Sequence, residues 1–227
     1  MTERGMIFNG EMVRAILDGR KTQTRRPVKF PVHDKNLGCE LSGNELAGEL
    51  SAGNYLNSAF GKPGDRIWVR EAYRFPASLD DVSPTGVGEM AVATGYRKPW
   101  APTFYEFTGT FSDGWKGFET PPKVSDAGKL RPSIHMPRWA SRILLEITDV
   151  RVERLNAISE EDARAEGIID GGCLNCGEPE PCGCANPEPD ATDAFAYLWQ
   201  SIYGQENWLA NPWVWVIEFK RVEGGAA

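Results

Sequence analysis

The sequence has no apolar run near the roughly 18 residues that a membrane-spanning helix requires. Its first ten residues, MTERGMIFNG, lack the apolar segment of a secretion signal. It also has no G-x-S-x-G, Walker or Rossmann motif, so serine hydrolases of that type and nucleotide-dependent enzymes have little support. These absences predict a cytoplasmic protein that does not associate with a membrane.

Basic residues are outnumbered, and those present are unevenly placed. The chain has 25 lysines and arginines against 32 acidic residues, a formal net charge of −7, which argues against coating of long nucleic acid. Residues 1–29 nevertheless hold seven basic and three acidic residues. This local excess suits a nucleoside or a short single-stranded nucleic acid. Alternatively, these charges simply face water. The densest basic segment is DGRKTQTRRPV (18–28), with Arg20, Lys21, Arg25 and Arg26.

Hydrophobic residues make up 41% of 227 positions, enough for a substantial core. Asn9 is expected to cap a first helix that Gly19 ends, and Ser159 with Asp162 to form a capping box. Apolar periodicity and turn signals predict the other elements, and the expected fold is α+β with a small curled sheet or barrel. Helices are expected within 9–19, 158–168 and 193–204, and strands within 62–73, 141–155 and 212–222.

Three segments are interpreted as inserts in a single domain, 1–227. The first two are 33–60, rich in Gly, Asn and Ser, and 74–133, with many Pro and Gly. Ten aromatic residues lie within 73–118, and nucleobases stack on such rings. Trp100 and Trp115 are the candidate ligand-stacking residues because Lys98 and Lys116 lie beside them. The alternative is that most of these rings form a second small core.

The third insert, 169–192, contains four of the five cysteines in the pattern C-x2-C-x5-C-x-C. In a cytosolic protein, clustered thiols favour a metal over disulfides, and four thiolates suit a structural zinc ion with no open coordination position. The alternative is a loop without metal that is open to oxidation. The candidate ligands are Cys173, Cys176, Cys182 and Cys184.

The segment GRKTQTRR (19–26) resembles the G-x-K-x-x-(E/T)-x-R signature of ASCH domains, which are small PUA-like β-barrels associated with RNA and modified nucleosides. Three further pieces follow in the same order as in that family: the PGD turn with its strand, the helix ISEEDARAEG, and the strand WVIEFK. The chain also resembles phage and prophage proteins of ASCH type. The resemblance leaves the three inserts uncovered.

Acetylcytidine amidohydrolases are the ASCH proteins that the chain resembles most. They hydrolyse the amide on the exocyclic amine of cytidine with a lysine, a threonine and a glutamate, and with an arginine nearby. The resemblance implies that Lys21, Thr24, Glu166 and Arg26 have these roles. As members of the basic segment, Arg20 and Arg25 are the candidate ligand contacts.

Amide hydrolysis requires a nucleophile, a base and a donor for the oxyanion. A lysine whose pKa is lowered by nearby arginines could take the proton from Thr24. However, Lys21 and Thr24 face apart in a flat strand, so this mechanism requires a turn between them. The alternative readings are that Thr24 is an ordinary β-strand residue, that Glu166 is exposed, and that the protein is a non-catalytic, phage-derived partner of a host protein.

The cysteine pattern predicts a measurable metal content. Protein purified under reducing conditions without chelator should contain about one zinc ion per chain, and Cys176→Ser should lose most of it. Metal analysis by mass spectrometry checks this. Protein with no bound metal under these conditions would end the zinc interpretation.

Overall fold

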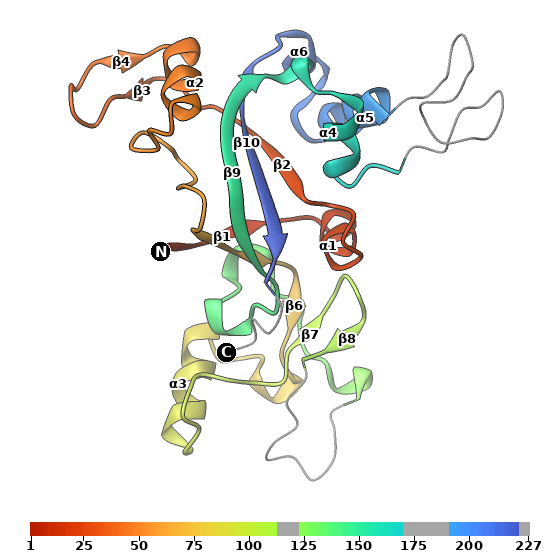
Figure 1. The fold of residues 1–227 in the computed structure, drawn as a ribbon. Coiled ribbons are helices and arrows are strands. Elements are labelled where there is room, and N and C mark those ends of the chain that lie inside the picture. Colours follow the sequence, from red (N-terminus) through yellow and green to blue (C-terminus); the bar gives the residue numbers. More distant parts are fainter. Residues whose placement is uncertain (113–122, 170–190, 223–227) are drawn as a thin grey trace, which may run out of the picture. The chain divides into compact units, whose positions relative to one another are not determined.

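A computed structural model describes residues 1–112, 123–169 and 191–222 (Figure 1). The chain forms two compact units, each discontinuous in sequence. Unit 1 comprises Met1–Arg14, Arg66–Leu145 and Arg221–Ala227, and unit 2 comprises Ala15–Asp65 and Glu146–Lys220. Each unit has its own cluster of buried apolar side chains. Among the described residues, no helix is both long and apolar enough to cross a membrane.

The chain contains several strands and several short helices that do not alternate regularly, which confirms the α+β class. The largest sheet has the strand order β1-β5-β9-β10-β2. No strand pairing among the described residues closes it into a barrel. Its members are β1 (Glu3–Ile7), β2 (Gln23–Pro27), β5 (Arg66–Arg70), β9 (Leu144–Arg154) and β10 (Trp213–Arg221).

The first helix, α1 (Gly10–Leu17), begins and ends as the sequence predicts. Asn9 Oδ1 accepts a hydrogen bond from the Met12 N–H at 2.9 Å, and Gly19 has a φ of 79°, which favours glycine. The expected strand in 62–73 is also confirmed. In β5, Ile67 and Val69 are buried while their neighbours are partly exposed, as alternation predicts.

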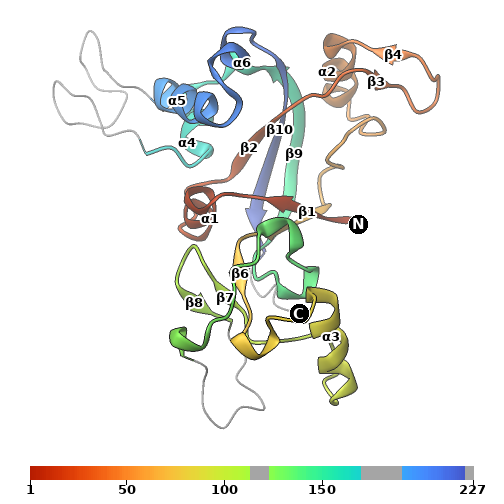
Figure 2. The ribbon, with the colours of Figure 1, turned by 180° about the vertical axis from the view of Figure 1, so that it is seen from behind.

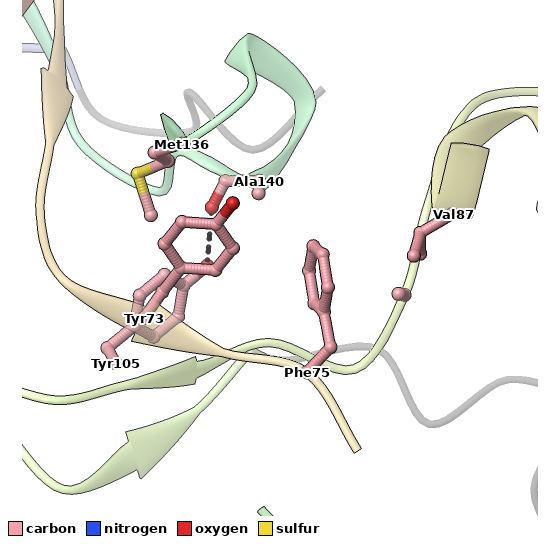
Figure 3. Close-up of a cluster of buried hydrophobic side chains, with 7 residues drawn as sticks. Tyr73, Phe75, Val87, Tyr105, Met136 and Ala140 are labelled. Carbon is pink, nitrogen blue, oxygen red and sulfur yellow. Dashed lines mark hydrogen bonds between the residues drawn. The ribbon is translucent and has the colours of Figure 1, made fainter. Parts of the chain in front are cut away.

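Unit 1 pairs β1 with β5 in parallel and has a separate sheet of β6 (Tyr73–Arg74), β7 (Phe104–Tyr105) and β8 (Thr110–Phe111). Its buried cluster is shown in Figure 3. The Tyr105 hydroxyl donates to the Ala140 carbonyl at 3.1 Å, and the Phe75 ring stacks on Trp139. Burial raises the pKa of Tyr73 to about 12. The aromatic residues Tyr73, Phe75 and Tyr105 therefore form a second core, as the alternative reading of this insert held.

Unit 2 pairs β2 with β10 in antiparallel register, with Thr24 opposite Ile217 and Arg25 opposite Val216. Helices α4 (Glu160–Ala165), α5 (Ala191–Tyr203) and α6 (Gln205–Leu209) lie on one side of strands β2, β9 and β10, as Figures 1 and 2 show. Phe195 and Trp199 of α5 pack there against Val214 and Val216 of β10. These helices cover the face of the sheet that carries the site described below.

Two helices occur where the sequence predicts inserts without regular helices. Segment 33–60 contains α2 (Gly43–Ser51), with β3 (Val32–His33) and β4 (Glu40–Leu41) before it, and segment 74–133 contains α3 (Pro84–Ala93). Helix α2 has a complete capping box between Ser42 and Glu45. Single-turn 3₁₀ helices lie at Ala77–Leu79, Val124–Asp126, Ser133–His135, Arg138–Ala140 and Leu155–Ala157.

Two glycines of α2 provide a matched test of packing in unit 2. A Cβ on Gly43 would overlap the Trp213 ring, whereas one on Gly48 meets nothing within 4 Å. Gly43→Ala should therefore lower the free energy of unfolding by about 1–3 kcal/mol. Gly48→Ala should raise it by about 0.5–1 kcal/mol, because alanine favours a helix interior. Urea denaturation measures both changes, and a stabilising Gly43→Ala would show that α2 does not pack on Trp213.

Candidate functional site

The backbone around Lys21 is fixed by both α1 and α4. The Lys21 N–H donates to the Ala15 carbonyl at 3.0 Å, and the Thr22 N–H donates to the Ala165 carbonyl at 2.8 Å. Lys21 and Glu166 face each other in an isolated β-bridge. Gly167, with a φ of 89°, allows this approach, because a Cβ there would lie 3.0 Å from the Lys21 Cβ. The two segments are 145 positions apart in the sequence and meet at this point.

Lys21 and Glu166 form a buried ion pair. Lys21 Nζ lies 2.6 Å from Glu166 Oε2 and 2.8 Å from the Glu166 backbone oxygen. The two side chains are 0% and 2% exposed. An ammonium has three N–H donors, so these two bonds leave one without an acceptor among the described residues. The reading of Glu166 as an exposed residue is therefore wrong.

Burial lowers the pKa of the Lys21 ammonium below its ordinary value of 10.5. The charge of Glu166 and its hydrogen bond raise this pKa, while the charges of Arg26 and Arg25 lower it. The net direction is downward, because desolvation is the largest of these effects. Lys21 thus releases its proton more easily than an exposed lysine, as a general base requires.

Arg25, which the sequence places among the ligand contacts, is buried and engaged by internal carboxylates. Its Nη1 lies 3.4 Å from Glu166 Oε1, and its Nη2 lies 2.7 Å from Glu153 Oε1 and 3.0 Å from Asp162 Oδ2. Its side chain is 0% exposed, and its Cζ lies 5.8 Å from the centre of the Phe195 ring. Arg25 therefore has the position of an internal counter-ion and not that of a surface contact.

Arg151 extends these contacts toward the surface. Its guanidinium lies 3.1 Å from Asp162 Oδ1 and 3.2 Å from Glu153 Oε2, and it also bonds Glu218. Gln23 joins the same groups, because its Nε2 donates to Asp162 at 3.0 Å and to Glu218 at 3.1 Å. We call this set the charged network. Its members are Lys21, Gln23, Arg25, Arg151, Glu153, Asp162, Glu166 and Glu218.

The predicted capping box of α4 is only half formed. Ser159 Oγ accepts from the Asp162 N–H at 3.1 Å, as expected. The Asp162 carboxylate instead accepts from Gln23, Arg25 and Arg151. Burial opposes ionisation of Asp162, but the Gln23 hydrogen bond and the two arginine charges outweigh it and lower the pKa of this carboxyl. Asp162, at the position where a capping box usually has glutamate, therefore binds residues of the charged network and does not complete the helix cap.

Thr24 is separated from the Lys21 and Glu166 pair. Successive side chains of a strand point to opposite faces, so within β2 Thr24 lies on the face opposite to Gln23 and Arg25. Its hydroxyl is buried and has no hydrogen-bond partner among the described residues. The structure thus brings together Lys21, Glu166 and Arg25, and it does not place the Thr24 hydroxyl on Lys21. Residues 23–27 form a regular strand, and the Thr24 hydroxyl makes no hydrogen bond to Lys21.

The remaining predicted basic contacts lie nearer to solvent. Arg20 is exposed, lies 3.2 Å from Asp18 and donates to the Gly167 carbonyl at 2.9 Å. Arg26 is partly exposed, and its charge acts on Lys21. The basic segment is therefore not a solvated charge run, since Lys21 and Arg25 are buried within it.

The other candidate residues lie elsewhere. Trp100 belongs to unit 1, where it stacks on Tyr96 with ring centres 5.4 Å apart. Trp115 lies outside the described residues, as do the four predicted zinc ligands Cys173, Cys176, Cys182 and Cys184. The described part of the chain contains no group of three or more His, Cys, Asp and Glu side chains placed to hold a metal ion.

Sequence reasoning missed the outer part of the charged network. The signal is present in VRVERL, where Arg151 and Glu153 alternate with valines, and in QTR, where Gln23 and Arg25 alternate with a threonine. Polar residues at every second position of a strand expected to be covered by helices indicate a polar layer under those helices.

Comparison of the chain with protein-family models, with curated proteins and with solved structures finds no match.

The network makes a prediction about pH. Because the folded pKa of Asp162 lies below its ordinary value of 3.8, its stabilising effect is complete above that pH and is lost as the pH falls through the folded pKa. At pH 7, Asp162→Asn should lower the melting temperature by roughly 2–4 °C. The difference between wild type and variant should shrink below pH 3.8.

Glu161→Gln is the control, since Glu161 is exposed on the same helix. It should leave the melting temperature nearly unchanged at every pH. A difference between wild type and Asp162→Asn that stays constant down to the lowest pH would contradict a lowered pKa for Asp162.

Proposed function

We propose that this protein binds a modified cytidine and hydrolyses the amide on its exocyclic amine, with Lys21 and Glu166 as the acid–base pair. The observation that supports this most is the 2.6 Å contact between Lys21 Nζ and Glu166 Oε2 inside the protein. Replacing a buried ion pair by apolar residues of similar volume is often neutral or stabilising. Stability alone is therefore a weak explanation for the presence of a buried ion pair in a protein. Strongly perturbed, desolvated lysines are typical of catalytic sites.

The chemistry assigned to the pair uses water as the attacking group. Neutral Lys21 takes a proton from the water as its oxygen adds to the amide carbonyl carbon. The Lys21 ammonium then returns this proton to the exocyclic nitrogen as the C–N bond breaks, which yields cytidine and acetate. Glu166 holds Lys21 in place and stabilises its ammonium form, and Arg26 supplies positive charge for the oxyanion. Water replaces Thr24 as nucleophile because Thr24 lies on the other face of β2.

The proposal includes an ASCH type of fold for the chain. Its support is the order of elements around the signature: α1 leads into the segment 19–26, β5 follows the PGD turn, Glu166 directly follows α4, and β10 pairs with β2. Arg20 and Arg26 are the proposed contacts to a nucleoside or a short single-stranded nucleic acid, because they are the cations of this segment that solvent reaches.

Turnover of acetylcytidine to cytidine, followed by chromatography, tests the proposal. Lys21→Arg keeps the charge but removes a group that can titrate, and Glu166→Gln removes the carboxylate charge. Each should lower turnover by on the order of 10²–10⁴. Thr24→Val should cost much less. Nucleoside affinity and melting temperature are measured in parallel, so that a loss of fold is not read as a loss of catalysis.

Exposed neighbours provide matched controls. Thr22→Val and Glu161→Gln change the same residue types on the same segments and should leave turnover unchanged. If Thr24→Val abolishes turnover as fully as Lys21→Arg does, water is not the nucleophile and Thr24 is. Folded wild-type protein that leaves acetylcytidine intact over hours would overturn the proposed activity.

Burial of the pair favours a second candidate, a non-catalytic interaction protein in which Lys21 and Glu166 clamp α4 to β2. With side chains 0% and 2% exposed, a substrate reaches the pair only after neighbouring residues move. Under this reading Lys21→Arg lowers stability, no nucleoside is turned over, and the ligand is a short nucleic acid or another protein.

A further inference from the structure

Both oxygens of the Glu166 carboxylate are held, and each is held by a different cation. Oε2 lies 2.6 Å from Lys21 Nζ, and Oε1 lies 3.4 Å from Arg25 Nη1. All three side chains are at most 2% exposed. A carboxylate that is engaged at both oxygens keeps one orientation, which fixes the oxygen that faces Lys21.

Arg25 is held in turn from the side away from Glu166. Its second terminal nitrogen contacts Glu153 at 2.7 Å and Asp162 at 3.0 Å. These two carboxylates are 20% and 22% exposed, so the guanidinium lies between a buried carboxylate and two that solvent partly reaches. Because a guanidinium is planar, these contacts also fix the nitrogen that faces Glu166.

We propose that Arg25 is the positioning residue of the Lys21 and Glu166 pair: it holds the Glu166 carboxylate by Oε1, so that Lys21 shares the negative charge of Glu166 with Arg25, and it adds its own positive charge to the field at the Lys21 ammonium. Any effect of Arg25 on catalysis rests on the proposed function. The contacts of Arg25 with Glu166, Glu153 and Asp162 are independent of that function. Three charged groups act on Lys21, namely Glu166 at the end of α4 and Arg25 and Arg26 on β2.

The charge of Arg25 acts on the Lys21 ammonium in the same direction as burial does. Burial lowers the pKa of Lys21 most, and Arg26 and Arg25 lower it further against the opposing effect of Glu166. Removal of Arg25 deletes a repulsive charge and leaves Glu166 to interact with Lys21 alone. Both changes favour the protonated lysine.

The test compares Arg25→Gln with Arg151→Gln. Both variants remove a guanidinium that contacts Glu153 and Asp162, but only Arg25 contacts Glu166. The titration of Lys21 is followed by NMR of ¹³C-labelled lysine, and the Lys21 signal is assigned by its loss in Lys21→Arg. Arg25→Gln should shift the midpoint upward, and Arg151→Gln should leave it in place even if the melting temperature falls.

An unchanged midpoint in Arg25→Gln, or an equal shift in both variants, would overturn the proposal. If Arg25→Gln does not fold, Arg25→Lys provides the test, because lysine keeps the charge but cannot contact all three carboxylates as the guanidinium does. A raised midpoint of the Lys21 titration in Arg25→Lys then supports positioning by the planar guanidinium of Arg25. A midpoint equal to that of wild type overturns it.

Turnover is a second measurement, and it separates the proposed hydrolase activity from the positioning role of Arg25. If wild type hydrolyses acetylcytidine, Arg25→Gln should lower kcat at neutral pH by on the order of tenfold, with KM little changed and with activity recovered at higher pH. A kcat loss of equal size at every pH would indicate a general structural defect and overturn the positioning role. If wild type has no activity but Arg25→Gln still raises the Lys21 midpoint, the proposed function fails and the positioning stands.

Discussion

The contact between Lys21 and Glu166 is the constraint on which the charged part of unit 2 depends. An ammonium and a carboxylate that are both removed from water carry a desolvation cost of several kcal/mol per ion, which good geometry and additional hydrogen bonds must offset. The surrounding residues provide these bonds. The Glu166 backbone oxygen accepts a second bond from Lys21, and Arg25 contacts the second carboxylate oxygen. Loss of Glu166 leaves the buried Lys21 ammonium without a carboxylate partner among the described residues, and loss of Lys21 leaves Glu166 with only the 3.4 Å contact to Arg25.

The charged network connects this buried pair to the protein surface. It is built from alternate residues of β2 and β9, from Glu218 of β10 and from α4, so a sheet face that α4 covers carries charge where an apolar layer would be usual. The apolar packing of unit 2 lies alongside, where Phe195 and Trp199 of α5 meet β10. Helix α4 takes part in both, because its Asp162 contacts Arg25 and its Ala163 belongs to the apolar cluster.

Local features of the fold could be predicted from the sequence because their signals lie within a few residues. Asn9 and Gly19 bound α1, and the PGD turn precedes the alternating strand β5. Helices α2 and α3 were missed, although Ser42 with Glu45, and Ser83 with Pro84, are ordinary N-terminal signals. Their glycines, which are typical of loops, outweighed these signals.

The site could be predicted only in part. The resemblance to ASCH domains named Lys21 and Glu166, which do meet. The burial of Arg25 could not be foreseen, because its partners Glu153 and Asp162 come from segments more than a hundred positions away. A run of basic residues shows where charge is concentrated, but not which carboxylates the fold brings to it.

The most direct test of the whole account is the pKa of Lys21 in the wild-type protein, measured by NMR titration of the ¹³C-labelled lysine side chain. We predict that Lys21 titrates below 10.5, apart from the exposed lysines, and that its signal moves with the loss of one proton. A Lys21 that stays protonated up to or beyond 10.5 would be only a fixed counter-ion of Glu166, and it would contradict an acid–base role for the pair.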